Sequence, residues 1–256
     1  MQTITLETDR RGVATLMLNR REKHNALSRE MIDDLTDAAR VLGADKSVRV
    51  VVLRAAGKSF CAGGDLAWMR AQFDAEDEVR RMEAKALADM LKALNDLPKP
   101  LIGALQGHVF GGGVGLASVC DHVVACDGIK LGLTETKLGI IPATIGPYVL
   151  ARVGAGMARR IFMSSRLFDA QEAFTLGLVG RVVSRETLDQ AIEEEVLPYL
   201  ECKPGAVAAA KNLIADLGYS PTDDQIETSI NALVARWASE EAQQGISEFF
   251  DGKSAI

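Results

Sequence analysis

Short apolar runs alternate along the chain with stretches in which apolar residues recur every three or four positions. The runs predict β-strands, because a strand that is covered on both faces of a sheet is apolar along its length. Five runs are present: Val13–Leu18, Val48–Leu53, Leu101–Leu105, His122–Ala125 and Lys130–Leu133. Glycine-bearing loops follow the second and third runs. The alternation predicts an α/β fold whose ligand-binding groups gather at the strand ends.

The first helix is predicted to begin after Ser28, whose hydroxyl can accept a hydrogen bond from a helix N-terminus. It continues through Leu42, and Gly43 is the expected stop. Its apolar face consists of Ile32, Leu35, Ala39 and Leu42. A second helical stripe consists of Val79, Met82, Ala86, Met90 and Leu94.

The second half of the chain is increasingly helical. Asp169 and Glu172 have the spacing of a capping box, which predicts a short helix that ends at Gly177. Beyond Pro204 strand patterns are absent, and an apolar stripe consists of Ile226, Ile230, Leu233, Val234 and Trp237. This region could pack on the rest of the domain or against a neighbouring subunit.

Composition places the chain among ordinary soluble globular proteins. Its 256 residues are 48% hydrophobic and 25% charged, enough for one sizeable domain. The 29 Lys and Arg against 35 Asp and Glu give a net charge of −6, which argues against a broad nucleic-acid surface. A local basic pocket for a phosphorylated cofactor remains compatible with this balance.

The cysteines and histidines favour no metal site and no disulfide framework. Cys61, Cys120, Cys126 and Cys202 lack metal-type spacing and are expected to be reduced thiols, and the three histidines are scattered. No leader-like segment or run of transmembrane length is evident, so we expect no membrane partner and a cytoplasmic location. A processed organellar protein would have the same features.

Four glycines lie within five positions of the stretch Gly107–Ala117, directly before a helix-like run. Without side chains, backbone N–H groups can approach a ligand closely, and the N-terminus of a helix adds partial positive charge. Such a stretch suits an oxygen that gains negative charge during a reaction. The alternative is a close-packed turn between strand and helix.

Three motifs in order, Ser59–Leu66, Gly107–Ala117 and Gly132–Pro142, resemble those of the crotonase (enoyl-CoA hydratase/isomerase) superfamily. Segments Asn19–Leu27 and Ala170–Leu178 fit the same pattern. The resemblance implies an α/β spiral of ββα units over residues 1–200 and a helical trimerisation region over residues 201–256. It also implies an acyl-CoA thioester substrate and a homotrimer or homohexamer. Coenzyme A would arrive as part of the substrate, so no separate cofactor is expected.

The same resemblance implies that the thioester carbonyl lies between the backbone N–H groups of Gly64 and Gly112. The loops 19–27 and 58–66 would bind the coenzyme A, with Lys23 as the candidate phosphate contact, although it could be an ordinary exposed lysine. Asp65 could equally cap the helix that follows it. The predicted substrate-binding residues are Lys23, Ala26, Ala62, Asp65, Leu66, Trp68, Gly111 and Gly115.

Hydratases of the superfamily typically carry two glutamates, and this chain has one of them. Glu135 matches the second, whereas Gly115 stands at the position of the first. One carboxylate can still move a proton if burial tunes its pKa. We therefore expect a hydro-lyase with Glu135 as general acid and base. The alternatives are a Δ3-Δ2-enoyl-CoA isomerase that uses the same glutamate, and a catalytically degenerate binding protein.

The segments around Glu135 and Asp65 most resemble bacterial hydratases of branched substrates such as 3-methylglutaconyl-CoA. Glycine at position 115 removes several atoms and a negative charge, which would leave room for a branched or anionic acyl chain. Arg70, Lys137 and Arg152 are the candidate partners for a distal carboxylate on that chain.

Overall fold

Two β-sheets carry the first two thirds of the chain, and the strands from β3 to β8 alternate between them. In the computed structural model, which describes residues 1–252, the six-stranded sheet has the order β1-β2-β3-β5-β7-β10 and the four-stranded sheet the order β4-β6-β8-β9. The strands are β1 (Ile4–Thr8), β2 (Val13–Leu18), β3 (Val50–Ala55), β4 (Ser59–Cys61), β5 (Leu101–Leu105), β6 (His108–Phe110), β7 (His122–Cys126), β8 (Lys130–Gly132), β9 (Leu167–Asp169) and β10 (Arg181–Val183).

Each turn of the chain adds one strand to each sheet. Strands β3, β5 and β7 are parallel neighbours in the larger sheet, and the strands that follow them, β4, β6 and β8, are parallel neighbours in the smaller one. The intervening helices are α1 (Arg29–Ala44), α2 (Leu66–Phe73), α3 (Asp77–Asn95), α4 (Gly112–Ser118), α5 (Gly146–Phe162) and α6 (Ala170–Thr175). The architecture is the predicted spiral of ββα units.

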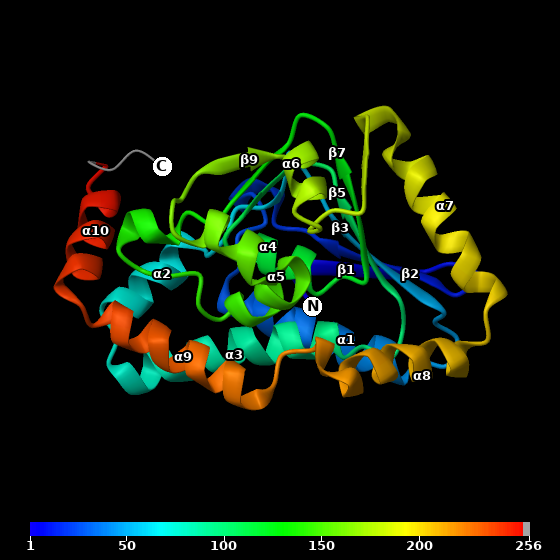
Figure 1. Ribbon diagram of the computed structural model, residues 1–256, viewed down its shortest axis with the longest axis horizontal. Helices are drawn as coiled ribbons and strands as arrows, with labels where there is room; N and C mark the ends of the chain where they lie inside the picture. The colour runs from blue at the N-terminus through cyan, green and yellow to red at the C-terminus, as the bar shows by residue number, and fades with distance from the viewer. Residues whose placement is uncertain (253–256) are drawn as a thin grey trace.

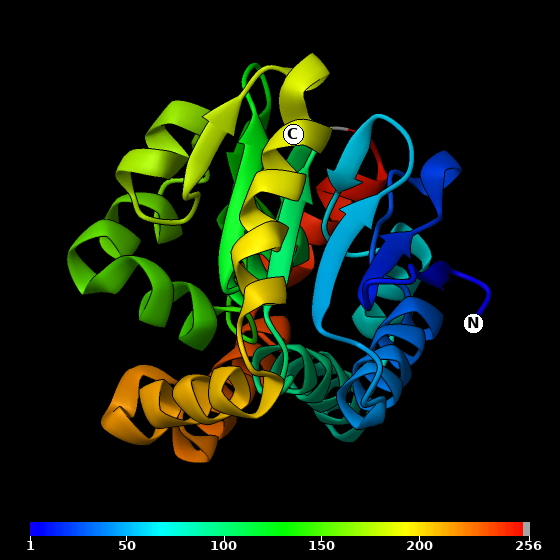
Figure 2. The same cartoon turned by 90° about the vertical axis from the view of Figure 1, so that its right-hand side faces the viewer.

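Helices enclose the sheets, as Figures 1 and 2 show. Helix α7 (Leu188–Glu201) packs on strands β3, β5 and β7 of the larger sheet, and α1 packs along α3. The interior is apolar, with Leu16, Leu53 and Leu105 of the larger sheet and Phe60 of the smaller one fully buried. Burial of these side chains is the main favourable term in folding.

The C-terminal helices are α8 (Pro204–Ile214), α9 (Asp223–Trp237) and α10 (Glu240–Phe250); α9 and α10 pack on their own domain, whereas α8 buries none of its residues. Helix α9 lies along α3, and α10 contacts the short helix η2 (Glu135–Leu138), which places α10 at the left of Figure 1. The boundary at residue 200 stays a prediction, and residues 253–256 lie outside the described part. Within residues 1–252, no helix has both the length and the apolar character needed to cross a bilayer.

Several predicted boundaries are confirmed and others are wrong. Strands β2 and β5 have the predicted limits, and the Ser28 hydroxyl accepts a hydrogen bond from the Met31 N–H at 3.3 Å. Gly43 lies inside α1 rather than ending it, because one glycine costs a packed helix only about 1 kcal/mol. Strand β3 begins at Val50, two residues later than expected.

The predicted stripe of α3 is wrong in its first half. Val79 and Met82 are exposed, whereas Met90 and Leu94 are buried as expected. The first turns of α3 instead direct polar side chains toward a cavity, so hydrophobic spacing alone gave the wrong face.

The predicted capping box at α6 is only half formed. Asp169 accepts a hydrogen bond from the Glu172 N–H at 2.8 Å. The Glu172 carboxylate pairs with Arg166 and Arg160 instead of reaching back to the helix start, because a charged partner binds it more strongly than a backbone N–H.

Gly113 lets α4 approach β4, and we expect Gly113→Ala to destabilise the protein. A Cβ there would lie 2.8 Å from the Cβ atom of Cys61. The free energy of unfolding should fall by about 1–3 kcal/mol in chemical denaturation. Gly156→Ala, in α5, is the control, because its Cβ would meet no other part of the described chain within 4 Å. Equal stability of the two variants would contradict the close-approach argument.

Candidate active site

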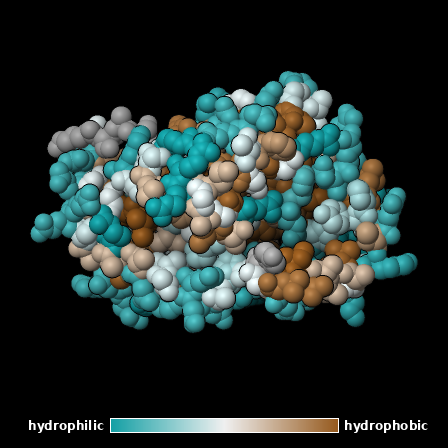
Figure 3. Space-filling view, viewed as in Figure 1, coloured by the Kyte–Doolittle hydropathy of each residue, from teal (hydrophilic) through white to brown (hydrophobic). Residues whose placement is uncertain are grey.

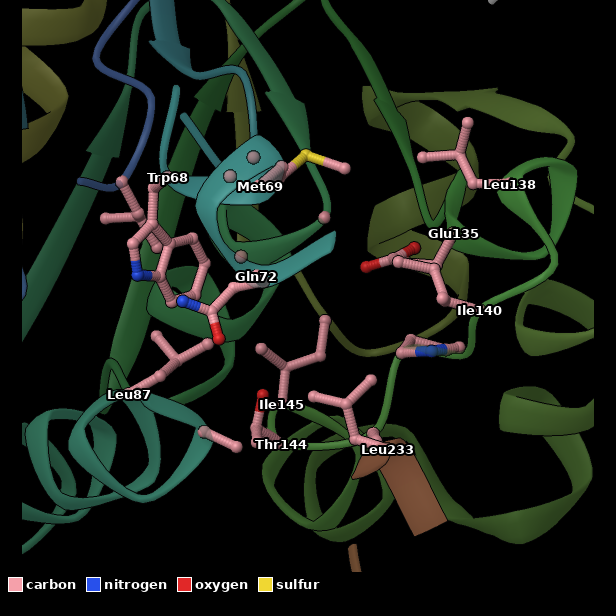
Figure 4. A pocket seen from close by; sticks show the side chains of 18 of the residues that line it. Trp68, Met69, Gln72, Leu87, Glu135, Leu138, Ile140, Thr144, Ile145 and Leu233 are labelled. Atoms are coloured by element: carbon pink, nitrogen blue, oxygen red, sulfur yellow. The ribbon is translucent and has the colours of Figure 1, made fainter. Parts of the chain in front are cut away.

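A cavity of about 170 Å³, hereafter the pocket, opens where α2 and α3 face the segment 134–145 and the C-terminal helices. Figure 4 shows its side chains converging from these elements. Most are apolar; those from the spiral include Met69, Leu87, Leu138, Ile140 and Ile145, and those from the C-terminal helices are Leu233, Trp237 and Phe249. The C-terminal helices therefore complete the wall of the pocket in the same chain.

Two glycine segments meet at the inner end of the pocket. A Cβ atom on Gly111 would lie only 3.4 Å from the Cα of Gly63, and one on Gly63 would lie 3.4 Å from the carbonyl oxygen of Phe110. Both glycines also have positive φ angles, +96° at Gly63 and +50° at Gly111. Such backbone is strained for residues with a side chain, so glycine is required at both positions.

The N–H groups of Gly64 and Gly112 donate no hydrogen bond to any residue between 1 and 252. Leu27 uses the opposite edge of the first segment: its N–H donates to Gly63 at 2.7 Å and its carbonyl accepts from Asp65 at 2.9 Å. The Gly64 N–H consequently points away from Leu27. Gly112 is the first residue of α4, where a helix leaves its N–H groups without partners.

Leu27 also explains why position 112 is a glycine. A Cβ atom there would lie 2.6 Å from the Leu27 Cδ1, an impossible contact in a packed interior. One buried leucine thus holds the first glycine segment by its backbone and covers the second with its side chain.

Glu135 begins η2 and faces these two segments. Its Oε1 would lie 3.2 Å from a Cβ on Gly111, and its Oε2 is buried without a hydrogen-bond partner among the described residues. Burial raises the pKa of Glu135 to about 7, although a hydrogen bond from its own backbone N–H opposes the shift. The site therefore sets a carboxyl group that can exchange protons at neutral pH beside two free N–H donors.

The prediction that Gly115 leaves extra room in the pocket is wrong. Gly115 is fully buried, and a Cβ atom there would lie 2.5 Å from Cγ2 and 2.9 Å from Cβ of Ile145. Ile145 is 3% exposed and lines the pocket itself. Its side chain fills the volume that a residue at 115 would need, so Gly115 does not line the pocket.

Asp65 caps helix α2, which is the structural role that the sequence analysis gave as the alternative to substrate binding. Its Oδ1 accepts from the N–H groups of Ala67 and Trp68 at the start of α2, and its Oδ2 accepts from Arg20 at 2.9 Å. Burial acts to raise the pKa of Asp65, but these hydrogen bonds outweigh it and hold the pKa below its usual value. Arg20 also donates to the carbonyl of Ala26, so it ties loop 19–27 to loop 58–66.

The other predicted substrate-binding residues divide into two groups. Ala62, Leu66, Trp68 and Gly111 line the pocket. Lys23 lies on the exposed surface of η1 (Arg21–Lys23), and its contact with a phosphate stays a prediction.

The three cations expected beside a distal carboxylate are not pocket residues. Arg70 stacks on the Phe250 ring at 4.1 Å, Lys137 is exposed, and Arg152 donates to the carbonyl of Asp121. The cation that does line the pocket is Arg80, which the sequence analysis missed.

Five polar residues of the pocket were not predicted as site residues: Gln72, Arg80, Glu83, Thr134 and Thr144. The Glu83 carboxylate accepts hydrogen bonds from Trp68 Nε1 at 2.8 Å and from Arg29 at 3.0 Å. It therefore joins α3 to α2 through Trp68 and to α1 through Arg29. In the sequence these residues look like the solvated face of a helix. The sequence offered one clue: Val79 and Met82 did not have to lie on the buried face of α3, so the polar residues beside them could face the interior instead.

Comparisons with known proteins identify the family of this chain. A sequence model described as enoyl-CoA hydratase/isomerase matches residues 8–255. The mitochondrial methylglutaconyl-CoA hydratase of Mus musculus is 36% identical over 212 residues, which cover 80% of this chain and 67% of that protein. The crotonyl-CoA hydratase of Syntrophomonas wolfei is 28% identical over 268 residues, covering 99% and 97%.

Among solved structures, an enoyl-CoA hydratase from Mycobacterium avium is similar with a TM-score of 0.87. It is 30% identical, and the match covers 99% of this chain and 98% of that one. The sequence match over nearly the whole chain and the shared spiral confirm the resemblance drawn from the three motifs. This chain belongs to the enoyl-CoA hydratase/isomerase family.

Proposed function

We propose that the chain is an enoyl-CoA hydratase that adds water across the 2,3 double bond of a 2-enoyl-CoA. The observation that carries this proposal is the Glu135 carboxylate, buried without a partner beside the glycine segments that hold two free N–H groups. The retained carboxylate argues against a protein that only binds. Coenzyme A arrives with the substrate, along loops 19–27 and 58–66, and no separate cofactor takes part.

In the proposed reaction the thioester oxygen accepts hydrogen bonds from the Gly64 and Gly112 N–H groups. Ionised Glu135 takes a proton from water as the water oxygen bonds to C3, and the thioester becomes an enolate. The same carboxyl group then gives its proton to C2, so the product has gained one H at C2 and one OH at C3. Each preorganised donor of this kind contributes about 3–4 kcal/mol to transition-state stabilisation.

The acyl group in our proposal is short and branched or carboxylated, as in 3-methylglutaconyl-CoA. The volume of about 170 Å³ supports a short group, since a cavity of roughly 150 Å³ holds one benzene molecule. The similarity to the mouse methylglutaconyl-CoA hydratase supports the carboxylated form.

A second function, the shift of a 3,4 double bond to the 2,3 position, is favoured by one observation. Ile145 covers Gly115, so an apolar wall stands where a second carboxylate could hold water. In that reaction Glu135 removes a proton from C2 and returns it to C4, and no water is needed. The ultraviolet absorbance of the conjugated thioester separates the two reactions, because hydration removes it and isomerisation creates it.

We further propose that the chain assembles into a homotrimer or homohexamer. Large apolar side chains are exposed on α8 and the following π-helical turn, including Leu213, Ile214 and Leu217, each more than half exposed. Figure 3 shows hydrophobic residues gathered over this lower right region. Exposed apolar surface of this kind is typical of subunit contacts.

Glu135→Gln should abolish the proposed hydration. The amide keeps the size of the side chain but cannot take up and release a proton, so kcat should fall about 10²- to 10⁴-fold. The rate is followed by loss of the enoyl absorbance with crotonyl-CoA and 3-methylglutaconyl-CoA. Glu193→Gln, at a partly exposed glutamate of α7 paired with Arg11 and away from the pocket, is the matched control and should keep full activity. Undiminished hydration by Glu135→Gln would refute the assignment.

The pH dependence of kcat/KM should report the raised pKa of Glu135. The reaction begins with the ionised carboxylate, so the rate should fall about tenfold per pH unit below the pKa of about 7 and level off above it. Stopped-flow rates between pH 5 and pH 9 test this expectation. A midpoint near 4.5, the ordinary value for glutamate, would show that the carboxyl group is hydrated rather than buried.

Gly115→Glu alone should destabilise the protein rather than improve hydration. The new side chain would overlap Ile145 and bury a charge, which together should lower the free energy of unfolding by more than about 2 kcal/mol. Gly115→Glu combined with Ile145→Gly vacates that volume and should recover stability and hydrate crotonyl-CoA faster than the single variant. If the single variant is as stable as the parent protein, the Ile145 contact does not constrain position 115.

A further inference from the structure

Two polar side chains face the pocket without partners in the described chain. Gln72, in the last turn of α2, is 6% exposed, and its side-chain amide makes no hydrogen bond within residues 1–252. Thr144 is 3% exposed, and its hydroxyl is likewise unpaired within that range. Both line the pocket. The polar atoms of neither side chain are sealed off from the cavity, so both groups are open to a polar ligand group that enters the pocket.

Their place in the pocket separates them from the reacting atoms. Figure 4 shows the Gln72 amide reaching toward Trp68 and Leu87, whereas Glu135 enters from the opposite side. The Thr144 hydroxyl points into the space near Leu87 and Ile145 in the same view. The two groups are therefore suited to an acyl chain beyond its double bond, not to the thioester.

Arg80 supplies the charge at this end of the pocket. Its side chain is 10% exposed, and it donates to the carbonyls of Gln72 and Phe73 at 2.9 Å each and to Asp77 at 3.0 Å. An arginine has five N–H donors, and these three contacts use three of them. Two N–H donors of Arg80 are therefore left without a partner among the described residues. By holding the last turn of α2, Arg80 also fixes the residue that carries the Gln72 amide.

The charges around this end favour an anion over a cation. Glu83 is the nearest acid that lines the pocket, and both of its oxygens are occupied, by Trp68 and by Arg29. Asp77, the charged partner of Arg80, is 64% exposed, so water screens its charge. The groups left free are thus an amide, a hydroxyl and guanidinium N–H donors, a set that matches the oxygens of a carboxylate.

We propose that Gln72, Thr144 and Arg80 form a carboxylate subsite that selects acyl-CoA substrates whose acyl chain ends in a carboxylate. This rests on the proposed function, because it assigns the specificity of the same pocket. In this proposal the distal carboxylate is bound by residues that line the pocket, and not by Arg70, Lys137 and Arg152 as the sequence predicted. Gln72 and Thr144 are the specificity-determining residues, and Arg80 acts partly by positioning α2.

The test compares two thioesters of nearly equal shape, glutaconyl-CoA and 5-methylhex-2-enoyl-CoA, in which an isopropyl group replaces the carboxylate. Gln72→Met and Thr144→Val remove the hydrogen-bonding groups at similar volume. We expect kcat/KM for glutaconyl-CoA to fall about 10- to 100-fold in each variant, as for a lost hydrogen bond to a charged group. The value for 5-methylhex-2-enoyl-CoA should stay the same or rise. Met69→Leu, an apolar change in the same helix, should affect both substrates equally.

Affinities for the saturated analogues glutaryl-CoA and 5-methylhexanoyl-CoA, measured by calorimetry, make the test independent of turnover. If the parent protein turns over neither thioester but loses glutaryl-CoA affinity selectively on Gln72→Met, the subsite stands and the proposed hydration fails. If both thioesters are hydrated and each variant affects them equally, the hydration stands and the subsite is overturned. Equal affinity of the parent protein for both analogues would also overturn it.

Discussion

Two backbone N–H groups, at Gly64 and Gly112, have no hydrogen-bond partner within residues 1–252, and the rest of the site depends on this constraint. They lie together because two chain segments approach more closely than side chains would allow, and glycines occupy the contact positions. Leu27 holds the arrangement by hydrogen-bonding one segment and covering the other. The free energy spent on leaving these donors unpaired is recovered only when an anionic oxygen binds between them.

Glu135 meets this donor pair because the C-terminal helices hold η2 in place. Arg236 of α9 donates to the carbonyl of Gly139 at 2.9 Å, and Gly245 of α10 lies so close to Leu138 that a Cβ there would be 2.8 Å from its carbonyl carbon. Trp237 and Ile246 belong to one apolar cluster with Leu138 of η2. Helices α9 and α10, which carry none of the family motifs, thus help to exclude water from the carboxyl group, and burial raises its pKa.

The pocket combines an apolar wall with a few polar groups in separate places. Ile145 fills the volume above Gly115, so the reaction that we propose uses the carboxylate of Glu135 without a second acid at position 115. The polar residues of α2 and α3 stand at the other end, joined by Arg80 and Glu83. Reaction type and substrate choice are therefore set by different elements and could change independently.

The sequence by itself predicted an α/β fold, because its apolar runs alternate with helical stripes. The resemblance of its motifs to a known family implied the spiral of ββα units, the two donor glycines and the single glutamate. Glycine spacing shows where a side chain is excluded, and a run of apolar residues marks a buried strand. Only the tertiary structure decided what fills the space at Gly115 and which face of α3 is buried. Ile145 lies thirty residues from Gly115, and Arg80 faces a cavity rather than water. Periodicity cannot distinguish a polar residue in a pocket from one in solvent, because both avoid the apolar core.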